Sequence, residues 1–128
     1  MSNAQDVSWE FFHSGRFWNP SRRPPTDENL LLAVETLVTS FGRRAWAVQL
    51  FLDALAETDG GAPSRRSVNT TTAYVERIDP KTVEIRDKYG QFQNIAMPVA
   101  EFREMLSVLM DSMRRLFPEP NTDQSDQR

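Results

Sequence analysis

The sequence contains no cysteine, which excludes disulfide bonds, thiolate metal ligands and a cysteine nucleophile. Its only histidine is His13, so a metal site or a general base has a single imidazole to draw on. No apolar run approaches the roughly 20 residues that cross a bilayer, and the N-terminus lacks the pattern of a signal peptide. No nucleophile elbow, HExxH motif or phosphate-binding glycine loop occurs. These absences predict a cytoplasmic protein that is not an enzyme and uses no metal, cofactor or membrane.

The 128 residues fit one domain, and the net charge of -3 gives no general attraction to phosphate backbones or anionic membranes. Thirteen of the fifteen basic residues are arginine, whose planar guanidinium makes bidentate contacts with carboxylates and phosphates. Eight of these arginines form adjacent pairs: Arg22-Arg23, Arg43-Arg44, Arg65-Arg66 and Arg114-Arg115. Charged runs are usually solvated surface, so that is the default interpretation of the pairs.

The stretch WEFFHSGRFWNPSRRPP, residues 9–25, gathers five aromatic side chains, the histidine and three arginines. Residues 1–8 before it are polar and predict a frayed N-terminus. Residues 9–18 predict an extended segment with a turn at Ser14-Gly15. The prolines of NPSRRPP then predict that regular structure stops, because proline lacks a backbone donor and restricts the residue before it.

Two segments follow the period of a helix. TDENLLLAVETLVTSF predicts a helix with Thr26 as its N-cap and Gly42 as its stop. Its apolar stripe comprises Leu30, Val34, Leu37, Val38 and Phe41. The next segment, residues 44–57, is ambiguous between helix and strand, and helix propensity at its LDALAE end favours a helix. The helical period comprises Val48, Phe51, Leu52 and Leu55, and the alternating strand pattern comprises Trp46, Val48, Leu50 and Leu52.

From Thr70 the period changes to two, and TTTAYVERI, TVEIRD and QFQNIAM predict a three-stranded antiparallel meander. Asp79-Pro80-Lys81-Thr82 suits the first turn. Pairing Ile78 with Val83 sets Arg77 opposite Glu84, whereas a slip of one residue would oppose Glu84 with Glu76, a disfavoured pair of like charges. This register places on the core face Tyr74, Ile78, Val83 and Ile85.

PVAEFREMLSVLMDSMRRLF predicts a closing helix, and PEPNTDQSDQR, residues 118–128, is polar enough to predict a disordered tail. The helix stripe comprises Phe102, Met105 or Leu106, Leu109, Met113 and Leu116. Core positions are the expected role of Met105, Met110 and Met113. The fold class is therefore α+β, one domain over residues 9–117: an N-terminal aromatic segment, one or two helices, a three-stranded meander and a C-terminal helix packed on the sheet.

Three interpretations of the aromatic stretch stay open. Its rings fill the core, anchor a protein partner, or stack on bases while arginines hold phosphates. These rings belong to Trp9, Phe11, Phe12, Phe17 and Trp18. The acidic net charge places nucleic acid last. For His13 a structural or surface role is expected, because the sequence offers it no partner nucleophile or ligand set.

Acidic residues gather in two places: Asp53, Glu57 and Asp59 at the end of the ambiguous element, and Asp79, Glu84 and Asp87 on or beside the meander. Nothing in their spacing brings two carboxylates together for acid–base work. Solvated faces are the default. The alternative is a surface that mimics phosphates and occupies a basic cleft of a partner.

The segment VEIRDKYGQFQNIAMPVAEFREMLSVL resembles the ending of small bacterial immunity proteins from polymorphic toxin and contact-dependent inhibition systems. In those proteins a strand leads through an acidic-glycine turn to another strand, and then to a helix that opens with P-x-x-E-F. The matching residues are Asp87, Tyr89, Gly90, Phe92, Ile95, Pro98, Glu101, Phe102 and Leu106. The resemblance covers residues 74–117.

This resemblance implies a small, non-catalytic, cytosolic protein that neutralises a cognate toxin by direct binding, and an acidic inhibitor suits a basic toxin. The leading hypothesis is such an immunity protein, with a toxin domain as partner. The alternatives are a nucleic-acid-binding module and a small structural or accessory subunit, and a homodimer stays open. The predicted partner-binding residues are Trp9, Phe12, His13, Arg16, Trp18, Asp53, Glu57, Asp59, Asp87 and Tyr89.

Overall fold

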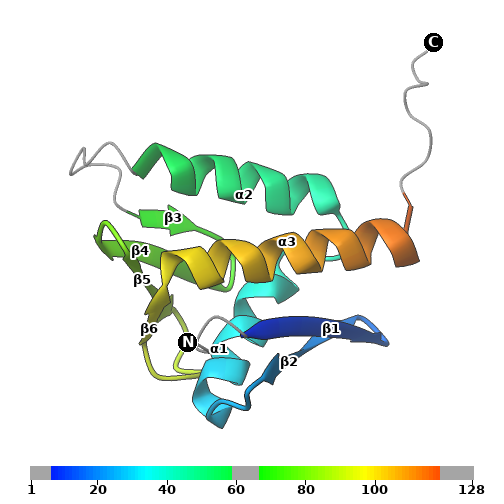
Figure 1. Ribbon diagram of the computed structural model, residues 1–128, viewed down its shortest axis with the longest axis horizontal. Helices are drawn as coiled ribbons and strands as arrows, with labels where there is room; N and C mark the ends of the chain where they lie inside the picture. Colours follow the sequence, from blue (N-terminus) through cyan, green and yellow to red (C-terminus); the bar gives the residue numbers. More distant parts are fainter. Residues whose placement is uncertain (1–6, 59–66, 119–128) are drawn as a thin grey trace.

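The computed structural model describes residues 7–58 and 67–118, which form three helices and two antiparallel sheets (Figure 1). In chain order the elements are β1 Ser8–Ser14, β2 Phe17–Arg23, α1 Glu28–Thr39, α2 Ala45–Glu57, β3 Ser67–Asn69, β4 Ala73–Asp79, β5 Thr82–Asp87, β6 Ile95–Pro98 and α3 Val99–Leu116. The α+β class is confirmed, with two sheets where one meander was predicted. The predicted frayed start and polar tail fall almost entirely outside the described residues.

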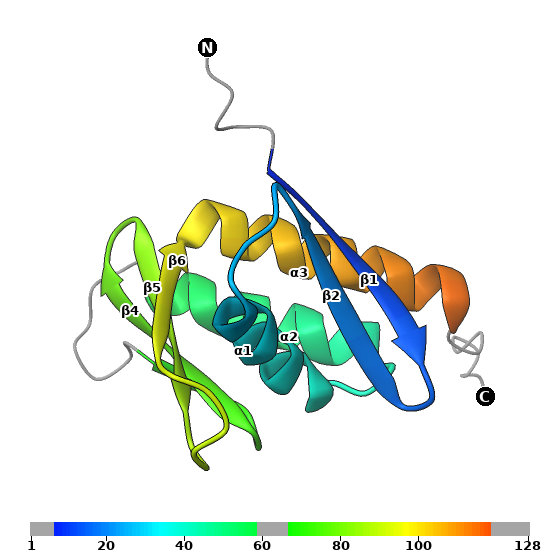
Figure 2. The same ribbon diagram turned by 90° about the horizontal axis from the view of Figure 1, so that it is seen from below.

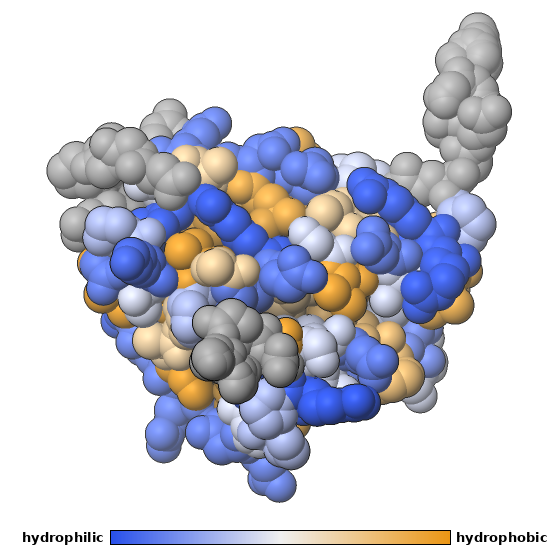
Figure 3. All heavy atoms as spheres, in the orientation of Figure 1, coloured by the Kyte–Doolittle hydropathy of each residue, from blue (hydrophilic) through white to orange (hydrophobic). Residues whose placement is uncertain are grey.

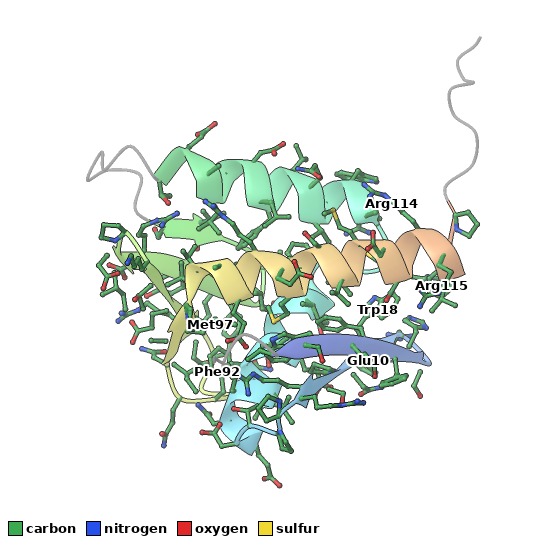
Figure 4. The ribbon with its side chains drawn as sticks, in the orientation of Figure 1. Glu10, Trp18, Phe92, Met97, Arg114 and Arg115 are labelled. Atoms are coloured by element: carbon green, nitrogen blue, oxygen red, sulfur yellow. The ribbon has the colours of Figure 1, made fainter. Side chains whose placement is uncertain are left out.

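The helix α1 lies between the β1–β2 hairpin and the four-stranded sheet, and α2 and α3 run side by side across both (Figures 1 and 2). One core joins the inner face of the hairpin, the three helices and the inner face of the larger sheet. Trp18 from the hairpin and Met97 from β6 enter it from opposite ends of the molecule (Figure 4). None of the described helices combines the length and apolar content that a membrane crossing needs.

The helix α1 follows its predicted stripe, all five residues of which are buried. Its N-cap is Asp27 rather than the predicted Thr26, because the Asp27 Oδ1 atom accepts a hydrogen bond from the Leu30 backbone N–H at 2.9 Å. Beyond its C-terminus Gly42 has φ +62°, a conformation that favours glycine, as the predicted stop requires.

The ambiguous segment is a helix, α2. Val48 and Leu55 are fully buried and Phe51 is nearly so, which is the helical stripe, and Leu52 is half-buried. The alternating pattern that suggested a strand has a different meaning. Trp46 and Leu50 belong to the opposite, solvent-facing side of the helix.

The hairpin continues through Pro20, so the predicted end of regular structure at NPSRRPP is wrong. Gly15, with φ +63°, takes the first central position of a two-residue turn closed by Ser14 and Phe17. From that closing pair, hydrogen-bonded and non-hydrogen-bonded residue pairs alternate along the hairpin. Pro20 lies opposite Phe11 in a non-hydrogen-bonded pair, so its backbone nitrogen is directed away from β1. The donor that proline lacks is therefore not required by the hairpin.

Two tryptophans fasten the hairpin to the helices. The Trp18 Nε1 atom donates to the Gly42 carbonyl at 2.7 Å, which fixes the turn between α1 and α2. The Trp9 Nε1 atom donates to the Glu101 carboxylate at 2.8 Å, and the Arg22 Nε atom donates to the same oxygen at 2.8 Å. Both indoles are buried with their N–H groups satisfied, so they contribute apolar area without an unpaired polar atom.

The larger sheet has the order β3-β4-β5-β6, and the predicted register between β4 and β5 is wrong by one residue. Arg77 faces Val83, and Glu76 faces Glu84. The predicted turn between these strands is confirmed, with Asp79 opposite Thr82 and an irregularity after Arg77. The strand β3 was not predicted, and the third predicted strand is limited to β6.

Burial explains the observed register. Ala73, Val75, Val83 and Ile85 share the inner face and are fully buried, whereas Ile78 is 45% exposed. The predicted core residue Tyr74 lies on the outer face and is half-buried. Burying a valine or isoleucine side chain contributes about 1.5–3 kcal/mol, so Val75, Val83 and Ile85 together outweigh one like-charge pair at the surface.

The repulsion within the like-charge pair is reduced by Arg86, which lies two residues along β5 from Glu84 and contacts both carboxylates. The Arg86 Nη1 atom lies 3.5 Å from Glu76 Oε1 and nearer still to Glu84 Oε1. Its Nε atom donates to the Tyr74 hydroxyl at 3.1 Å. That hydrogen bond is the main cause that raises the pKa of Arg86; desolvation opposes it, and both glutamates add to it.

Arg77 occupies a core-facing position of β4 because α2 ends beside it. Its Nε atom donates to Thr58 Oγ1 at 2.8 Å, and its Nη1 atom donates to the Pro80 carbonyl at 3.0 Å. Its Nη2 atom reaches the Leu55 carbonyl at 3.5 Å. A cation at the C-terminus of a helix also opposes the negative end of the helix dipole, so Arg77 joins the sheet to α2.

The helix α3 confirms the predicted closing helix. Its stripe is buried except for Leu116, which is 48% exposed. The three methionines predicted for the core, Met105, Met110 and Met113, are buried.

We expect Glu101→Ala to lower the free energy of unfolding by about 2 kcal/mol, because an indole N–H and a guanidinium lose their shared, partly buried acceptor. Urea unfolding followed by tryptophan fluorescence measures the loss. Glu104→Ala, at an exposed position of the same helix, is the matched control and should change stability by under about 0.5 kcal/mol. Equal losses in the two variants would contradict this account of the hairpin.

We expect Arg86→Met to lower the urea midpoint, because Glu76 and Glu84 then face each other without a cation between them. Adding Glu84→Gln to Arg86→Met should restore part of the lost midpoint, since the remaining carboxylate faces a neutral amide. A double variant that is less stable than Arg86→Met alone would show that the like-charge pair is not the source of the loss.

Candidate functional site

The solvent-facing side of α2 carries two large exposed apolar residues. Trp46 is 53% exposed and Leu50, one turn later, is 59% exposed. Asp53 and Glu57 are exposed and continue the same line along the helix, because residues four, seven and eleven positions after Trp46 share its side. We call these four residues the α2 face.

A groove of about 350 Å³ runs beside the apolar half of the α2 face. Its walls are the turn that follows α1, the helix α2 as far as Ala54, and the segment from β3 into the following turn. The lining residues are Ser40, Phe41, Trp46, Ala47, Leu50, Phe51, Ala54 and Val68 to Thr71. Phe41 and Phe51 are buried core residues whose rings pack 5.5 Å apart, so the groove has an apolar base on a rigid part of the fold.

Polar contacts order both halves of the α2 face. The Arg44 guanidinium lies 5.7 Å from the centre of the Trp46 ring, a cation–π contact at the start of the helix. The Gln49 Nε2 atom donates to Asp53 Oδ1 at 2.9 Å, which holds that carboxylate one turn beyond Leu50. The face therefore passes from an apolar end to an acidic end.

The hairpin separates the predicted aromatic residues into two groups. Trp9 and Trp18 are 3% and 1% exposed, so they are core residues rather than surface anchors for a partner. Phe12 and Phe17 point to the outer face and are 56% and 46% exposed. Alternation along each strand causes this division, and Arg16 is exposed in the turn.

His13 is half-buried and contacts two aromatic rings. Its imidazole makes edge contacts with Trp18 and Phe117, each with ring centres 4.7 Å apart. Arg43 lies over the other side of this cluster, 4.7 Å from the Phe117 ring centre. In the part of the chain that the structure describes, no group of three potential metal-ligating side chains comes together. His13 therefore packs the end of α3 against the hairpin.

Asp87 organises a loop rather than presenting a carboxylate. Its Oδ1 atom accepts from the backbone N–H groups of Tyr89 at 3.2 Å and Gln91 at 3.0 Å. Its own N–H donates to Asn94 Oδ1 at 2.8 Å. Desolvation would raise the pKa of Asp87, but the backbone donors outweigh it and hold that pKa below its ordinary value of 3.8. The loop presents Tyr89, which is 70% exposed.

The predicted partner-binding residues thus lie in three separate places. The hairpin, the α2 face and the Asp87 loop occupy different edges of the molecule (Figures 1 and 2). Asp59 lies outside the described residues. On the side that carries α2 and α3, apolar surface occurs in patches between charged side chains (Figure 3).

Sequence reasoning missed Trp46 and Leu50 as surface residues. Their positions in the sequence could have indicated this. In a helix, Trp46 and Leu50 fall on the side opposite the stripe that contains Val48, Phe51 and Leu55. A helix with apolar residues on its polar side has apolar surface that its own core does not use.

No protein-family model matches this chain, no curated protein matches it, and no solved structure matches it. Function must therefore be inferred from the chain's own residues and their arrangement.

We expect the Asp87 loop to lose its order in acid. A carboxyl whose pKa is lowered on folding contributes order above its ordinary value of 3.8, and that order is lost as the pH falls through the lower, folded value. The amide chemical shift of Gln91, followed from about pH 6 to pH 2, should titrate with a midpoint below that of an ordinary aspartate. Asp87→Asn should abolish the titration, and a midpoint at or above 3.8 would contradict the expected effect.

Proposed function

We propose that this chain is a non-enzymatic protein-binding protein, and that it acts as an immunity-type inhibitor that neutralises a bacterial toxin through its α2 face. The observation that carries the proposal is the pair Trp46 and Leu50, both more than half exposed beside a groove of about 350 Å³. Tryptophan is enriched among the residues that dominate binding energy at protein interfaces. Support also comes from the resemblance of residues 74–117 to immunity proteins.

The helix α2 suits this role because its other side is fixed in the core. Val48 and Leu55 are fully buried, and Arg77 binds the carbonyl of Leu55 at the C-terminal end. A partner therefore meets side chains whose backbone is already ordered, which reduces the entropy lost on binding. Burying an exposed tryptophan or leucine contributes about 1.5–3 kcal/mol to association.

The acidic half of the α2 face supports a basic partner. Asp53 and Glu57 extend the line from Trp46 and Leu50 and carry negative charge beyond the groove. Complementary charge mainly accelerates encounter and selects the partner, while the apolar pair supplies affinity. A toxin with a basic surface around an apolar pocket fits both halves.

Capture from native lysate after nuclease treatment, followed by mass spectrometry, identifies the partner. We expect Trp46→Ala/Leu50→Ala to weaken its binding by about 100-fold or more, because both apolar anchors are removed. Leu32→Ala/Ile78→Ala is the matched control, since these residues are 42% and 45% exposed on α1 and β4. Equal weakening by both double variants would contradict the assignment of the α2 face.

The inhibitory role requires a separate experiment. The captured partner, expressed alone in a sensitive host, should arrest growth, and co-expression of this chain should restore it. A partner that binds but harms no cell would leave a protein-binding function and overturn the immunity role. Recovery of nucleic acid that is lost steeply with salt would instead favour the arginine pairs as phosphate contacts.

A further inference from the structure

The strand β1 pairs on one side only. Within the described residues its sheet has two strands, and β2 is the single neighbour of β1. Ser14 and Phe17 form the hydrogen-bonded pair next to the turn, and hydrogen-bonded pairs alternate with non-hydrogen-bonded pairs along the hairpin. Trp9, Phe11 and His13 fall in non-hydrogen-bonded pairs, so their backbone N–H and C=O groups point away from β2. An edge of this kind is a template for a further strand.

A cleft of about 570 Å³ follows this edge. One wall is the run of four consecutive β1 residues from Glu10 to His13, and the other wall is the C-terminal half of α3. Side chains from both faces of β1 line it, because the cleft runs along the backbone edge rather than over one face of the hairpin. We call it the β1 cleft.

The chemistry of the β1 cleft is mixed. Its interior includes Phe11 and Ser112, each 4% exposed, and its rim includes Phe12, which is 56% exposed. Glu10 and Asp111 place two carboxylates in the lining against the single guanidinium of Arg115. Glu10 lies on β1 and Arg115 near the end of α3 (Figure 4).

We propose that the β1 cleft binds an extended peptide segment of a partner protein, which adds to β1 as a third strand and covers the C-terminal half of α3. The backbone groups of Phe11 and His13 supply main-chain hydrogen bonds, and alternate side chains of the segment enter the cleft. Net negative charge in the lining selects a segment with a lysine or arginine that reaches Glu10 and Asp111. This site is separate from the α2 face and does not depend on the proposed function.

A second copy of this chain fits the edge less well. Antiparallel pairing of two β1 strands about Phe11 would place Glu10 of each copy diagonally across from the other on one face. Both carboxylates would then meet a like charge. A basic segment from another protein meets them with opposite charge.

The test begins with selection of a phage-displayed library of random dodecapeptides on the full chain, followed by synthesis of the strongest peptide. Nuclear magnetic resonance should show slower exchange of the Phe11 and His13 amides when that peptide is bound. Two further versions of the peptide carry methyl groups on alternate backbone nitrogens, one on the odd-numbered and one on the even-numbered residues. One of the two should fail to bind, because its methyl groups replace the N–H donors that face β1.

Two variants locate the contact. His13→Pro removes one outward N–H without touching the β1–β2 ladder, as Pro20 does on β2, and should weaken binding by about tenfold relative to His13→Val. Glu10→Lys/Asp111→Lys reverses the charge of two exposed residues and should weaken binding of a basic peptide even if His13→Pro does not fold.

Failure to select any peptide would overturn the proposal, and so would binding that both methylated peptides retain or that leaves the Phe11 and His13 amides unchanged. Sedimentation that reveals a dimer whose partner strand protects these amides would assign the edge to a second copy instead. Binding lost only in Trp46→Ala/Leu50→Ala would assign the peptide to the α2 face and leave the β1 cleft without a ligand.

Discussion

The Glu101 carboxylate is the contact on which the arrangement of this molecule depends. Glu101 lies in the first turn of α3, and its carboxylate accepts hydrogen bonds from Trp9 on β1 and Arg22 on β2. A two-stranded hairpin is marginally stable alone, so its position comes from the helices to which it is bound. By binding both strands to the first turn of α3, Glu101 determines how β1 is positioned beside that helix. The β1 cleft lies between β1 and α3, so its shape depends on this position.

Trp18 has the corresponding role at the other end of the hairpin. Its bond to the Gly42 carbonyl holds the turn from which α2 begins, and so sets the direction in which Trp46 faces solvent. The positions of the β1 cleft and the α2 face thus depend on the hydrogen bonds of two buried indoles, those of Trp9 and Trp18. The aromatic residues near the N-terminus shape both surfaces mainly from inside, while Phe12 alone among the predicted rings adds to a rim.

Periodicity predicted α1 and α3 because each has one side in the core, as Leu30 and Phe102 show. For α2 a helical and a strand period both fitted the sequence, and helix propensity decided between them. The expectation that proline ends regular structure failed at Pro20, since the cost of a proline in a strand depends on the register of the partner strand, which the sequence does not state. The argument from cross-strand charge pairs failed at Glu76 and Glu84, because both carboxylates contact Arg86, which lies diagonally across the sheet from Glu76. Interactions between residues close in sequence can be predicted from the sequence, whereas ion-pair networks that connect different strands require the register to be known.

The same limit applies to the site. Asp53 and Glu57 were predicted as partner-binding residues because acidic residues gather at the end of that segment, but Trp46 was missed until the helix placed it on the same side. Side-chain oxidation of the complex with the captured partner tests the central claim most directly. We expect binding to protect Trp46 strongly and to leave Tyr89, which is 70% exposed on a different edge, as reactive as before. Protection of Tyr89 with Trp46 still reactive would contradict the assignment of the α2 face.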